Sequence, residues 1–173
     1  MLVAVTGTPG TGKSSVCAVL AGRGYTVVDL DEVARSGGFV TGRDEARQTD
    51  EVDVEALREN LHVPAKIAFL KGHYSHLMKV NVAVVLRCRP SALRARLAER
   101  GWPDSKIREN VEAEAIDSIL QEAVNRLDLV YEIDTTSRKA DEAAGELLGI
   151  LQGNSAGHEP GSVDWSGEVL SWY

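Results

Sequence analysis

Apolar and polar positions divide the chain into short apolar runs and longer stretches with helical spacing. The apolar runs, rich in β-branched residues, predict strands at residues 2–6, 25–29, 67–70, 82–87 and 130–134. The intervening stretches predict helices at residues 13–21, 31–36, 90–100, 105–126 and 140–151. Regular alternation of this kind is typical of crossover connections, which build a parallel sheet covered by helices on both faces. The pattern therefore predicts an α/β fold with five parallel strands and with ligands at the carboxyl ends of the strands.

The first predicted strand leads directly into the sequence GTPGTGKS at residues 7–14. This is a complete G-x-x-x-x-G-K-[ST] phosphate-binding loop, and a helix is predicted directly after it. The glycines let backbone N–H groups close around a β-phosphate, while Lys13 reaches the β- and γ-phosphates and the Ser14 hydroxyl ligates Mg²⁺. Because strand, loop and helix agree, a chance glycine-rich turn is a poor alternative. The sequence predicts a P-loop NTPase fold that binds a nucleoside triphosphate together with Mg²⁺.

Two segments depart from the alternation. Residues 37–65 are polar and acidic before a helix predicted at 54–60. Their position between the second and third strands suits an acceptor-nucleotide lid, and the alternative is a solvated surface loop. Residues 153–173 are rich in Gly and Ser but contain Trp165, Leu170, Trp172 and Tyr173. Because aromatic residues make up only 5% of the chain, this cluster predicts that the tail docks on the body of the protein or on a partner.

Composition narrows the class of protein. A chain of 173 residues with 43% hydrophobic residues is long enough for one domain with a real core. The formal net charge of −7 argues against a broad nucleic-acid surface and leaves room for a basic protein partner. Cys17 and Cys88 are expected to be buried, reduced thiols of a cytoplasmic protein. No apolar stretch approaches the roughly 20 residues needed to span a bilayer, and a strand rather than a signal peptide begins the sequence, so we expect no membrane association.

The late strand and a basic helix narrow the class of P-loop protein. Residues 133–137 read IDTTS and lack the N-K-x-D motif of a GTPase. The small size favours a nucleotide or metabolite kinase, in which arginines of a short helical lid clamp the migrating phosphoryl group. Arg96 and Arg100 are four residues apart and can share one helical face, and Gly101 can end that helix. Planar guanidinium groups suit a phosphoryl group, although the alternative is a solvated basic helix.

Further motifs carry a resemblance to a known family. The P-loop is followed by GHYSHL at residues 72–77, VLRCRP at 85–90, RLAERG at 96–101, KIRENVEAE at 106–114 and PGSVDWS at 160–166. In this combination the chain resembles the nuclear-type adenylate kinases, also known as the coilin-interacting ATPase family, and looks like a member of the archaeal branch. The resemblance covers nearly the whole chain. It implies a kinase domain at residues 1–152, with an AMP-binding insert at about 28–60 and a lid at about 99–109, followed by a tail at residues 153–173.

The resemblance implies the reaction ATP + AMP = 2 ADP, slow ATPase activity, and a role in small ribosomal subunit maturation and rRNA processing through a platform ribosomal protein. It implies an AMP contact from Arg35, and ATP contacts from Gly10, Thr11, Gly12, Lys13, Ser14, Ser15 and Arg100. With the arginine spacing, the expected catalytic residues are Lys13, His73, Arg96 and Arg100. Two other hypotheses stay open. One is an assembly ATPase that binds and releases a basic ribosomal protein, with AMP turnover incidental, and the other is a kinase for another monophosphate or a cofactor precursor.

The third strand departs from the family pattern. It usually ends in Asp/Glu-Gly-His, whose acid orders Mg²⁺, but here the sequence is Lys71-Gly72-His73. Two cations about 4 Å apart repel by roughly 4 kcal/mol at an effective dielectric constant near 20, so Lys71 must turn away from the metal or partly replace it. Asp29 and Asp31 are the nearest substitute ligands. Alternatively, Ser14, phosphates and water hold Mg²⁺. We expect weaker metal dependence of binding, or slower turnover.

Polar residues near these motifs leave several roles open. His73 and His76 have no nearby Cys or acidic ligand in the sequence, which argues against a zinc site. In the family the first histidine lies by the γ-phosphate, so a neutral His73 is expected to orient an attacking water, and the alternative is a histidine that caps a strand end. Asn110 and Glu114 share a face of the predicted helix 105–126, where they lock the lid helix to the body or contact nucleotide. Residues 135–139 are expected to cradle adenine.

Overall fold

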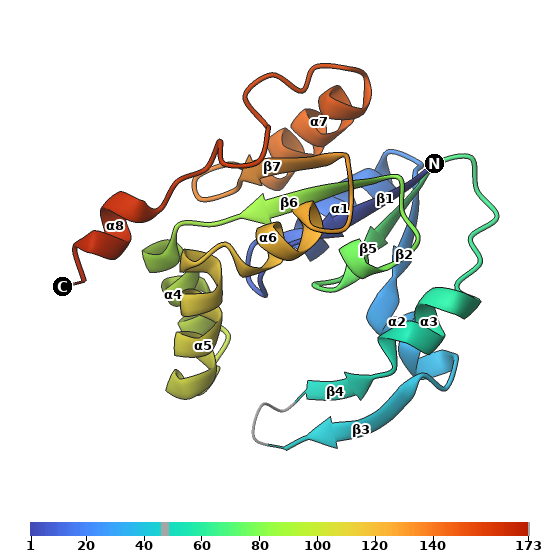
Figure 1. The fold of residues 1–173 in the computed structure, drawn as a ribbon, viewed down its shortest axis with the longest axis horizontal. Helices are drawn as coiled ribbons and strands as arrows, with labels where there is room; N and C mark the ends of the chain where they lie inside the picture. Colours follow the sequence, from blue (N-terminus) through green and yellow to red (C-terminus); the bar gives the residue numbers. More distant parts are fainter. Residues whose placement is uncertain (46–48, 173) are drawn as a thin grey trace.

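The structure is a computed structural model that describes residues 1–45 and 49–172. Its main sheet has the strand order β2-β5-β1-β6-β7, and all neighbouring strands are parallel (Figure 1). The five strands are β1 (Leu2–Thr6), β2 (Thr26–Asp29), β5 (Ala68–Lys71), β6 (Val82–Arg87) and β7 (Val130–Asp134). The predicted α/β fold with five parallel strands is therefore confirmed, and each expected strand lies within a residue or so of its predicted bounds.

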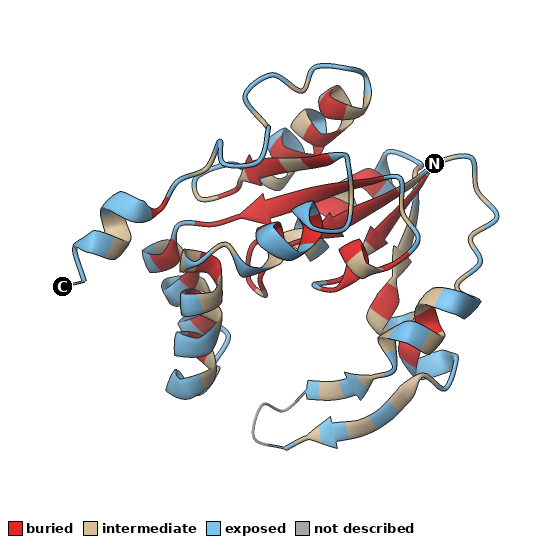
Figure 2. Ribbon diagram, in the orientation of Figure 1, coloured by how far each residue is buried: buried red, intermediate tan, exposed pale blue. Residues whose placement is uncertain are grey.

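Different helices cover the two faces of this sheet. Side chains alternate along a strand, so Val3 and Val5 of β1 point to one face and Ala4 points to the other. On the first face α1 (Lys13–Gly22) and α7 (Ala140–Leu151) pack against the strands, and on the second face α6 (Ser118–Val124) does so. In Figure 2 the strands β1, β5 and β6 are mostly buried at the centre of the molecule, while the edge strand β2 is only partly buried. Burial on both faces explains why these strands are continuous apolar runs in the sequence.

The prediction of one continuous helix at residues 105–126 is wrong, because two helices occupy this stretch. They are α5 (Asp104–Ala115) and α6, and they are separated at Asp117, which has a left-handed backbone with φ of 57°. The Asp117 carboxylate forms an ion pair with Arg87 at the end of β6. A long-range ion pair thus accompanies the break between α5 and α6. Helical spacing along the sequence gives no indication of this break.

The insert between β2 and β5 contains a hairpin that we did not predict. After α2 (Leu30–Ser36), strands β3 (Val40–Asp44) and β4 (Thr49–Val52) pair antiparallel, and α3 (Val54–Asn60) follows as expected. Residues 46–48 of the insert lie outside the described part. In Figure 1 the hairpin extends away from the sheet, on the same side as α4 (Pro90–Glu99) and α5. Most of the described insert is therefore regular structure, while residues 61–67 form an irregular connection from α3 to β5.

A buried ionic cluster joins the ends of β6 and β7 to α5. The Arg87 side chain is 1% exposed, and its Nε donates to Glu114 Oε1 over 2.8 Å. The same guanidinium also pairs with Asp117 and with Glu132 of β7. Removing one partner of such a buried pair costs about 3–5 kcal/mol, because it leaves an uncompensated charge. Arg87 thus fixes α5 to the sheet.

The C-terminal tail packs back on the body, which was one of the two expected arrangements. The Glu132 N–H donates to His158 O over 2.8 Å, and Trp165 is only 8% exposed. The short helix α8 (Ser166–Leu170) adds Glu168, whose carboxylate accepts from the Ser91 N–H over 2.8 Å. Leu170 and Trp172 stay exposed, and Tyr173 lies outside the described residues.

Two sequence-based expectations concern single features of the fold. Cys17 and Cys88 are buried free thiols, as expected. Within residues 1–45 and 49–172, no helix has the length and apolar character required to cross a membrane.

Candidate functional site

The P-loop joins β1 to α1 in a conformation that requires glycine. Gly7 and Gly10 have φ values of 133° and 96°, which L side chains rarely adopt. A Cβ on Gly7 would lie 2.3 Å from Leu86 O, and one on Gly10 would lie 2.7 Å from Leu93 Cδ1. The loop therefore packs closely against β6 on one side and against α4 on the other.

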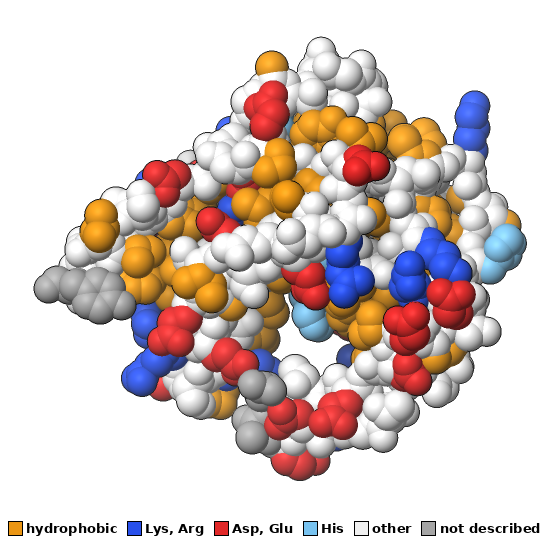
Figure 3. Space-filling model, in the orientation of Figure 1, with side chains coloured by type: hydrophobic (Ala, Val, Ile, Leu, Met, Phe, Trp, Pro, Cys, Tyr) orange, Lys and Arg blue, Asp and Glu red, His pale blue; other side chains and the backbone are white. Residues whose placement is uncertain are grey.

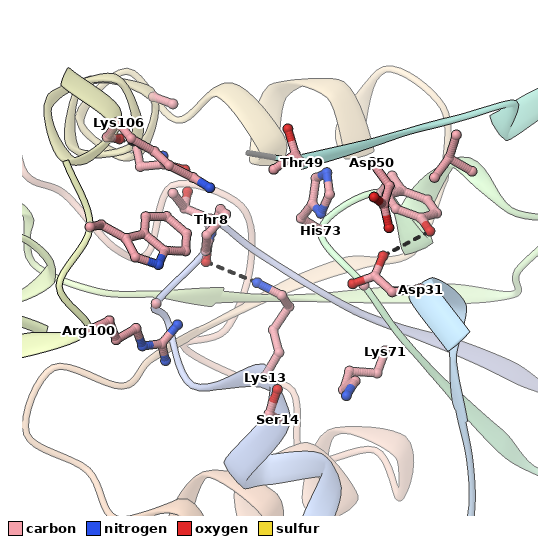
Figure 4. A pocket seen from close by; sticks show the side chains of 18 of the residues that line it. Thr8, Lys13, Ser14, Asp31, Thr49, Asp50, Lys71, His73, Arg100 and Lys106 are labelled. Atoms are coloured by element: carbon pink, nitrogen blue, oxygen red, sulfur yellow. Dashed lines mark hydrogen bonds between the residues drawn. The ribbon is translucent and has the colours of Figure 1, made fainter. Parts of the chain in front are cut away.

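Lys13 turns its ammonium group back onto the P-loop. Its Nζ donates to Gly7 O over 2.7 Å and to Thr8 O over 3.0 Å, and Figure 4 shows this group pointing into the cleft. Burial lowers the pKa of Lys13 to about 8, although the carboxylates of Glu114 and Asp31 act in the opposite direction. The protein therefore stabilises the protonated form of Lys13 only in part, and an anionic ligand would stabilise this form further.

A cleft of about 1280 Å³ opens in front of the P-loop. Figure 3 shows it as a hollow between the parts of the molecule that Figure 1 identifies as the hairpin and the α4–α5 region. Its walls combine the P-loop, the end of β5, the hairpin and the turn between α4 and α5. Among the residues expected at the site, those that line this cleft are Gly10, Gly12, Lys13, Ser14, Ser15, Asp31, Arg35, Lys71, His73 and Arg100.

A second hollow of about 480 Å³ adjoins the other side of the P-loop. Arg96 and Arg100 line it together with Thr135 and Arg138, which belong to the segment after β7 that was expected near adenine. Gly10, Gly12 and Ser15 line both hollows. The two spaces thus meet at the phosphate-binding loop. Thr11 is fully buried, and its carbonyl accepts from the Thr135 hydroxyl over 2.7 Å.

The two arginines of the expected lid have different surroundings. The Arg96 guanidinium donates to Thr135 O over 2.7 Å, to Thr136 O over 3.0 Å and to Gly10 O over 3.4 Å. It therefore connects the P-loop with the segment after β7. Arg100 follows α4 and lines both hollows, and Gly101, with φ of 70°, ends the helix as predicted. Of this pair, only Arg100 lines the larger cleft.

Lys71 pairs with one of the two acids considered as metal ligands. Asp29 and Lys71 lie opposite each other at the ends of the parallel strands β2 and β5, and their side chains form an ion pair. Asp31 instead lines the cleft, where its Oδ1 accepts from the Tyr74 hydroxyl over 3.0 Å (Figure 4). The strand-end cation is thus compensated within the protein. Asp31 is the candidate acid that remains on the cleft wall.

These neighbours fit Mg²⁺ but do not form a complete metal cage. The Ser14 hydroxyl and the Asp31 carboxylate offer oxygen atoms on the wall that also carries Lys13, and oxygen is the ligand that Mg²⁺ prefers. In the described ranges, no three residues among His, Cys, Asp and Glu form a group able to hold a metal by themselves. Phosphate oxygens and water would have to supply the remaining ligands.

The two histidines after β5 have separate positions. His73 is exposed on the cleft wall, and its ring meets Tyr74 edge-to-face with centroids 4.9 Å apart. Desolvation in the cleft and the charge of Lys13 lower the pKa of His73, so its imidazole is neutral at neutral pH. His76 is buried and lies 3.0 Å from the Thr6 hydroxyl through Nδ1 and 3.0 Å from Glu122 through Nε2. His76 thus joins β1 to α6.

Sequence reasoning missed several residues at the site. Arg43 and Asp50 face each other across the hairpin and line the cleft, and Asp50 also pairs with Arg35 over 2.9 Å. Only recognition of the hairpin could have found them. On the opposite wall, the Lys106 ammonium lies 4.1 Å from the centroid of the Trp102 ring. The spacing of four residues between these two was an available signal.

Comparison with known proteins places the chain in a family. Residues 3–117, more than half of the chain, match the family described as "AAA domain". A relative from Archaeoglobus fulgidus is 41% identical over 172 residues, which cover 98% of this chain and 94% of the relative. A relative from Methanothermobacter thermautotrophicus is 40% identical over 171 residues, which cover 98% of this chain and 99% of the relative. Both relatives bear the name "Putative adenylate kinase".

The chain therefore belongs to this AAA-domain family and is related over nearly its whole length to these archaeal proteins. Solved structures of more distant proteins share its fold. A shikimate kinase from Acinetobacter baumannii superposes with a TM-score of 0.63 at 16% identity, covering 90% of this chain and 94% of its own. A gluconokinase from Sinorhizobium meliloti superposes with a TM-score of 0.56 at 19% identity, and the match covers 88% of this chain and 92% of the gluconokinase. These family members and neighbours agree on a P-loop kinase fold.

The surroundings of Lys13 predict that binding of ATP takes up protons. With a pKa of about 8 in the free protein, Lys13 is half deprotonated near that pH, and the phosphates favour its charged form. We expect uptake of about half a proton per ATP near pH 8, and weaker ATP binding as the pH rises above this value. Calorimetry in buffers of different ionisation enthalpy measures the uptake. The Lys13→Arg variant, which does not titrate in this range, is the control, and unchanged uptake in that variant would assign the proton to another group.

Proposed function

We propose that this protein is an adenylate kinase that transfers the γ-phosphoryl group of MgATP to AMP and releases two ADP. The observation that carries the proposal is a single cleft with two unlike walls. One wall is the P-loop with Lys13, which suits a triphosphate, and the other is the insert with Arg35 and Arg43, which suits a second anion. The name borne by relatives about 40% identical over nearly the whole chain supports this choice of acceptor. Membership of the nuclear-type branch forms part of the proposal.

In this proposal the protein acts by positioning and electrostatics, because phosphoryl transfer asks for little covalent chemistry from the enzyme. Lys13 and the P-loop amides hold the donor phosphates, and Arg100 adds positive charge on the cleft wall. Arg96 is a positioning residue, since its guanidinium donates to carbonyl groups of the P-loop and of the segment after β7. Mg²⁺, held by Ser14 and Asp31 together with the phosphates, would neutralise part of the charge on the transferring group.

The donor nucleoside is assigned to the smaller hollow beside the P-loop. Thr135 and Arg138 line this hollow together with Arg96 and Arg100. The base and sugar of ATP would lie here while the triphosphate extends over the P-loop toward the larger cleft. AMP would then enter from the opposite side, between the hairpin and α2, so that its phosphate faces the end of the donor chain.

We include slow ATP hydrolysis and a ribosomal role in the proposal as secondary functions. His73 supports hydrolysis, because its neutral imidazole lies on the cleft wall and can accept a hydrogen bond from water. The exposed Leu170 and Trp172, in a chain of net charge −7, favour a basic protein partner such as a small-subunit platform protein. An assembly ATPase with incidental AMP turnover is the second candidate function, and it rests on this same surface.

The decisive test measures ADP formation from MgATP with and without AMP. We expect AMP to stimulate ADP formation strongly, with two ADP formed per AMP consumed, and we expect Lys13→Ala to abolish the stimulation. A panel of GMP, CMP, UMP and small phosphorylated precursors defines the acceptor. Slow hydrolysis that ignores AMP but accelerates with a basic ribosomal protein would contradict the kinase proposal and favour the assembly ATPase.

Arg35 provides a test of the acceptor wall. Loss of a charge-assisted hydrogen bond to a phosphate costs about 1.5–3 kcal/mol, so Arg35→Ala should raise KM for AMP by about 10- to 100-fold. The Kd for ATP should be unchanged, because Arg35 lies on the insert. Arg58→Ala is the matched control, since Arg58 lies on α3 and, within residues 1–45 and 49–172, its ion pairs join it to surface carboxylates of the same helix. Equal effects of the two variants on KM would remove Arg35 from the AMP site.

Lys71 provides a test of the metal requirement. Replacing it by Asp releases Asp29 from its ion pair and adds a second carboxylate at the strand ends. We expect Lys71→Asp to increase the difference between the Kd values for ATP measured with and without Mg²⁺. Lys71→Gln, which releases Asp29 without adding a charge, should fall between this variant and the unchanged protein. An unaltered metal dependence in both variants would show that the end of β5 has no part in holding Mg²⁺.

A further inference from the structure

Glu114 of α5 is a buried acid that contacts Thr8 of the P-loop. It is 3% exposed, and its Oε2 accepts from the Thr8 hydroxyl over 2.6 Å. Thr8 is also the residue whose carbonyl accepts from the Lys13 ammonium over 3.0 Å and from the Thr11 hydroxyl over 2.9 Å. One carboxylate oxygen of Glu114 therefore holds Thr8, whose own carbonyl accepts hydrogen bonds from two other P-loop residues.

The other oxygen of Glu114 accepts from three donors, which belong to two distant parts of the chain. Oε1 accepts from Arg87 Nε over 2.8 Å, from the Cys88 N–H over 3.2 Å and from Trp165 Nε1 over 3.2 Å. The first two belong to β6 and its end, but Trp165 belongs to the C-terminal tail, 51 residues beyond Glu114. Its indole also lies against the guanidinium, with Arg87 Cζ 5.9 Å from the ring centroid.

The tail makes a second contact with the same ionic cluster. The Gly161 N–H donates to Glu132 Oε2 over 2.6 Å, and Glu132 is the fully buried partner of Arg87 on β7. One guanidinium serves three carboxylates in this cluster, so neutral donors are needed to satisfy the remaining oxygen atoms. Residues 158–165 supply two of them. The tail therefore completes a network that reaches the P-loop, although none of its described residues, 153–172, lines the cleft.

We propose that Trp165 is a positioning residue of the ATP phosphate site, which acts by holding the Glu114 carboxylate against Thr8 of the P-loop. The docked tail is then part of the nucleotide-binding machinery, and release of the tail loosens the loop. This inference concerns the binding of the donor nucleotide. It therefore stands or falls independently of whether AMP is the acceptor.

A double-mutant cycle on ATP binding tests the proposal. Trp165→Phe keeps an aromatic side chain, although a smaller one, and removes the N–H donor, and Thr8→Val removes the hydroxyl and keeps the shape. We expect each single variant to raise the Kd for ATP by about three- to tenfold, as loss of one buried hydrogen bond would. If Trp165 acts through Glu114 on Thr8, the double variant binds ATP no more weakly than Thr8→Val alone. Trp172→Phe is the matched control, because Trp172 lies in the same tail and is 45% exposed.

Two results would overturn the proposal. One is a Trp165→Phe variant whose Kd for ATP equals that of Trp172→Phe, even if its melting temperature falls. The other is a double variant in which the two fold-changes multiply, because Trp165 would then act on the fold in general and not through Thr8.

Discussion

One buried guanidinium organises the carboxyl edge of the sheet. Arg87 ends β6, the strand beside β1, and the parallel order of the strands brings its side chain close to the start of the P-loop. Its carboxylate partners come from α5, from the turn before α6 and from β7, so a single side chain sets the direction in which each of these elements leaves the sheet. An unpaired charge at this buried position would cost free energy. An arrangement in which one of these elements left the cluster would leave a charge unpaired, so the ion pairs favour the observed arrangement. Through Glu114, Arg87 thus holds α5 in place, and α5 lines one side of the cleft.

The fold and the phosphate-binding loop could be predicted because their signals are local. The β1 strand, the glycines of residues 7–14 and the helix that begins at Lys13 are contiguous, and each strand of a sheet buried on both faces is an uninterrupted apolar run. The end of α4 could also be predicted from a local signal, because the single residue Gly101, in a left-handed conformation, ends the helix.

The parts that could not be predicted depend on contacts between distant residues. The break at Asp117 reflects an ion pair with a residue 30 positions earlier. The hairpin of the insert consists of short, half-exposed polar strands, whose alternation is too weak to stand out among the acidic residues. For Arg96, helical spacing suggested a cleft-facing side chain, but the carbonyl groups that hold it belong to the P-loop and to the segment after β7. For Lys71, the sequence showed an absent acid, and only the strand register showed that Asp29 neutralises it.

The close packing of Gly10 against Leu93 and Leu97 makes the two sides of the cleft mechanically unequal. On one side, α4 touches the loop itself and is anchored to the rest of the body by Arg96 and, through α5, by the Arg87 cluster. On the other side, the hairpin contacts α2 and α3 through apolar side chains such as those of Val40 and Val52 and through the ion pair between Asp50 and Arg35. A movement of the hairpin would leave the packing of Gly10 against α4 intact, whereas a movement of α4 would disturb the phosphate-binding loop itself.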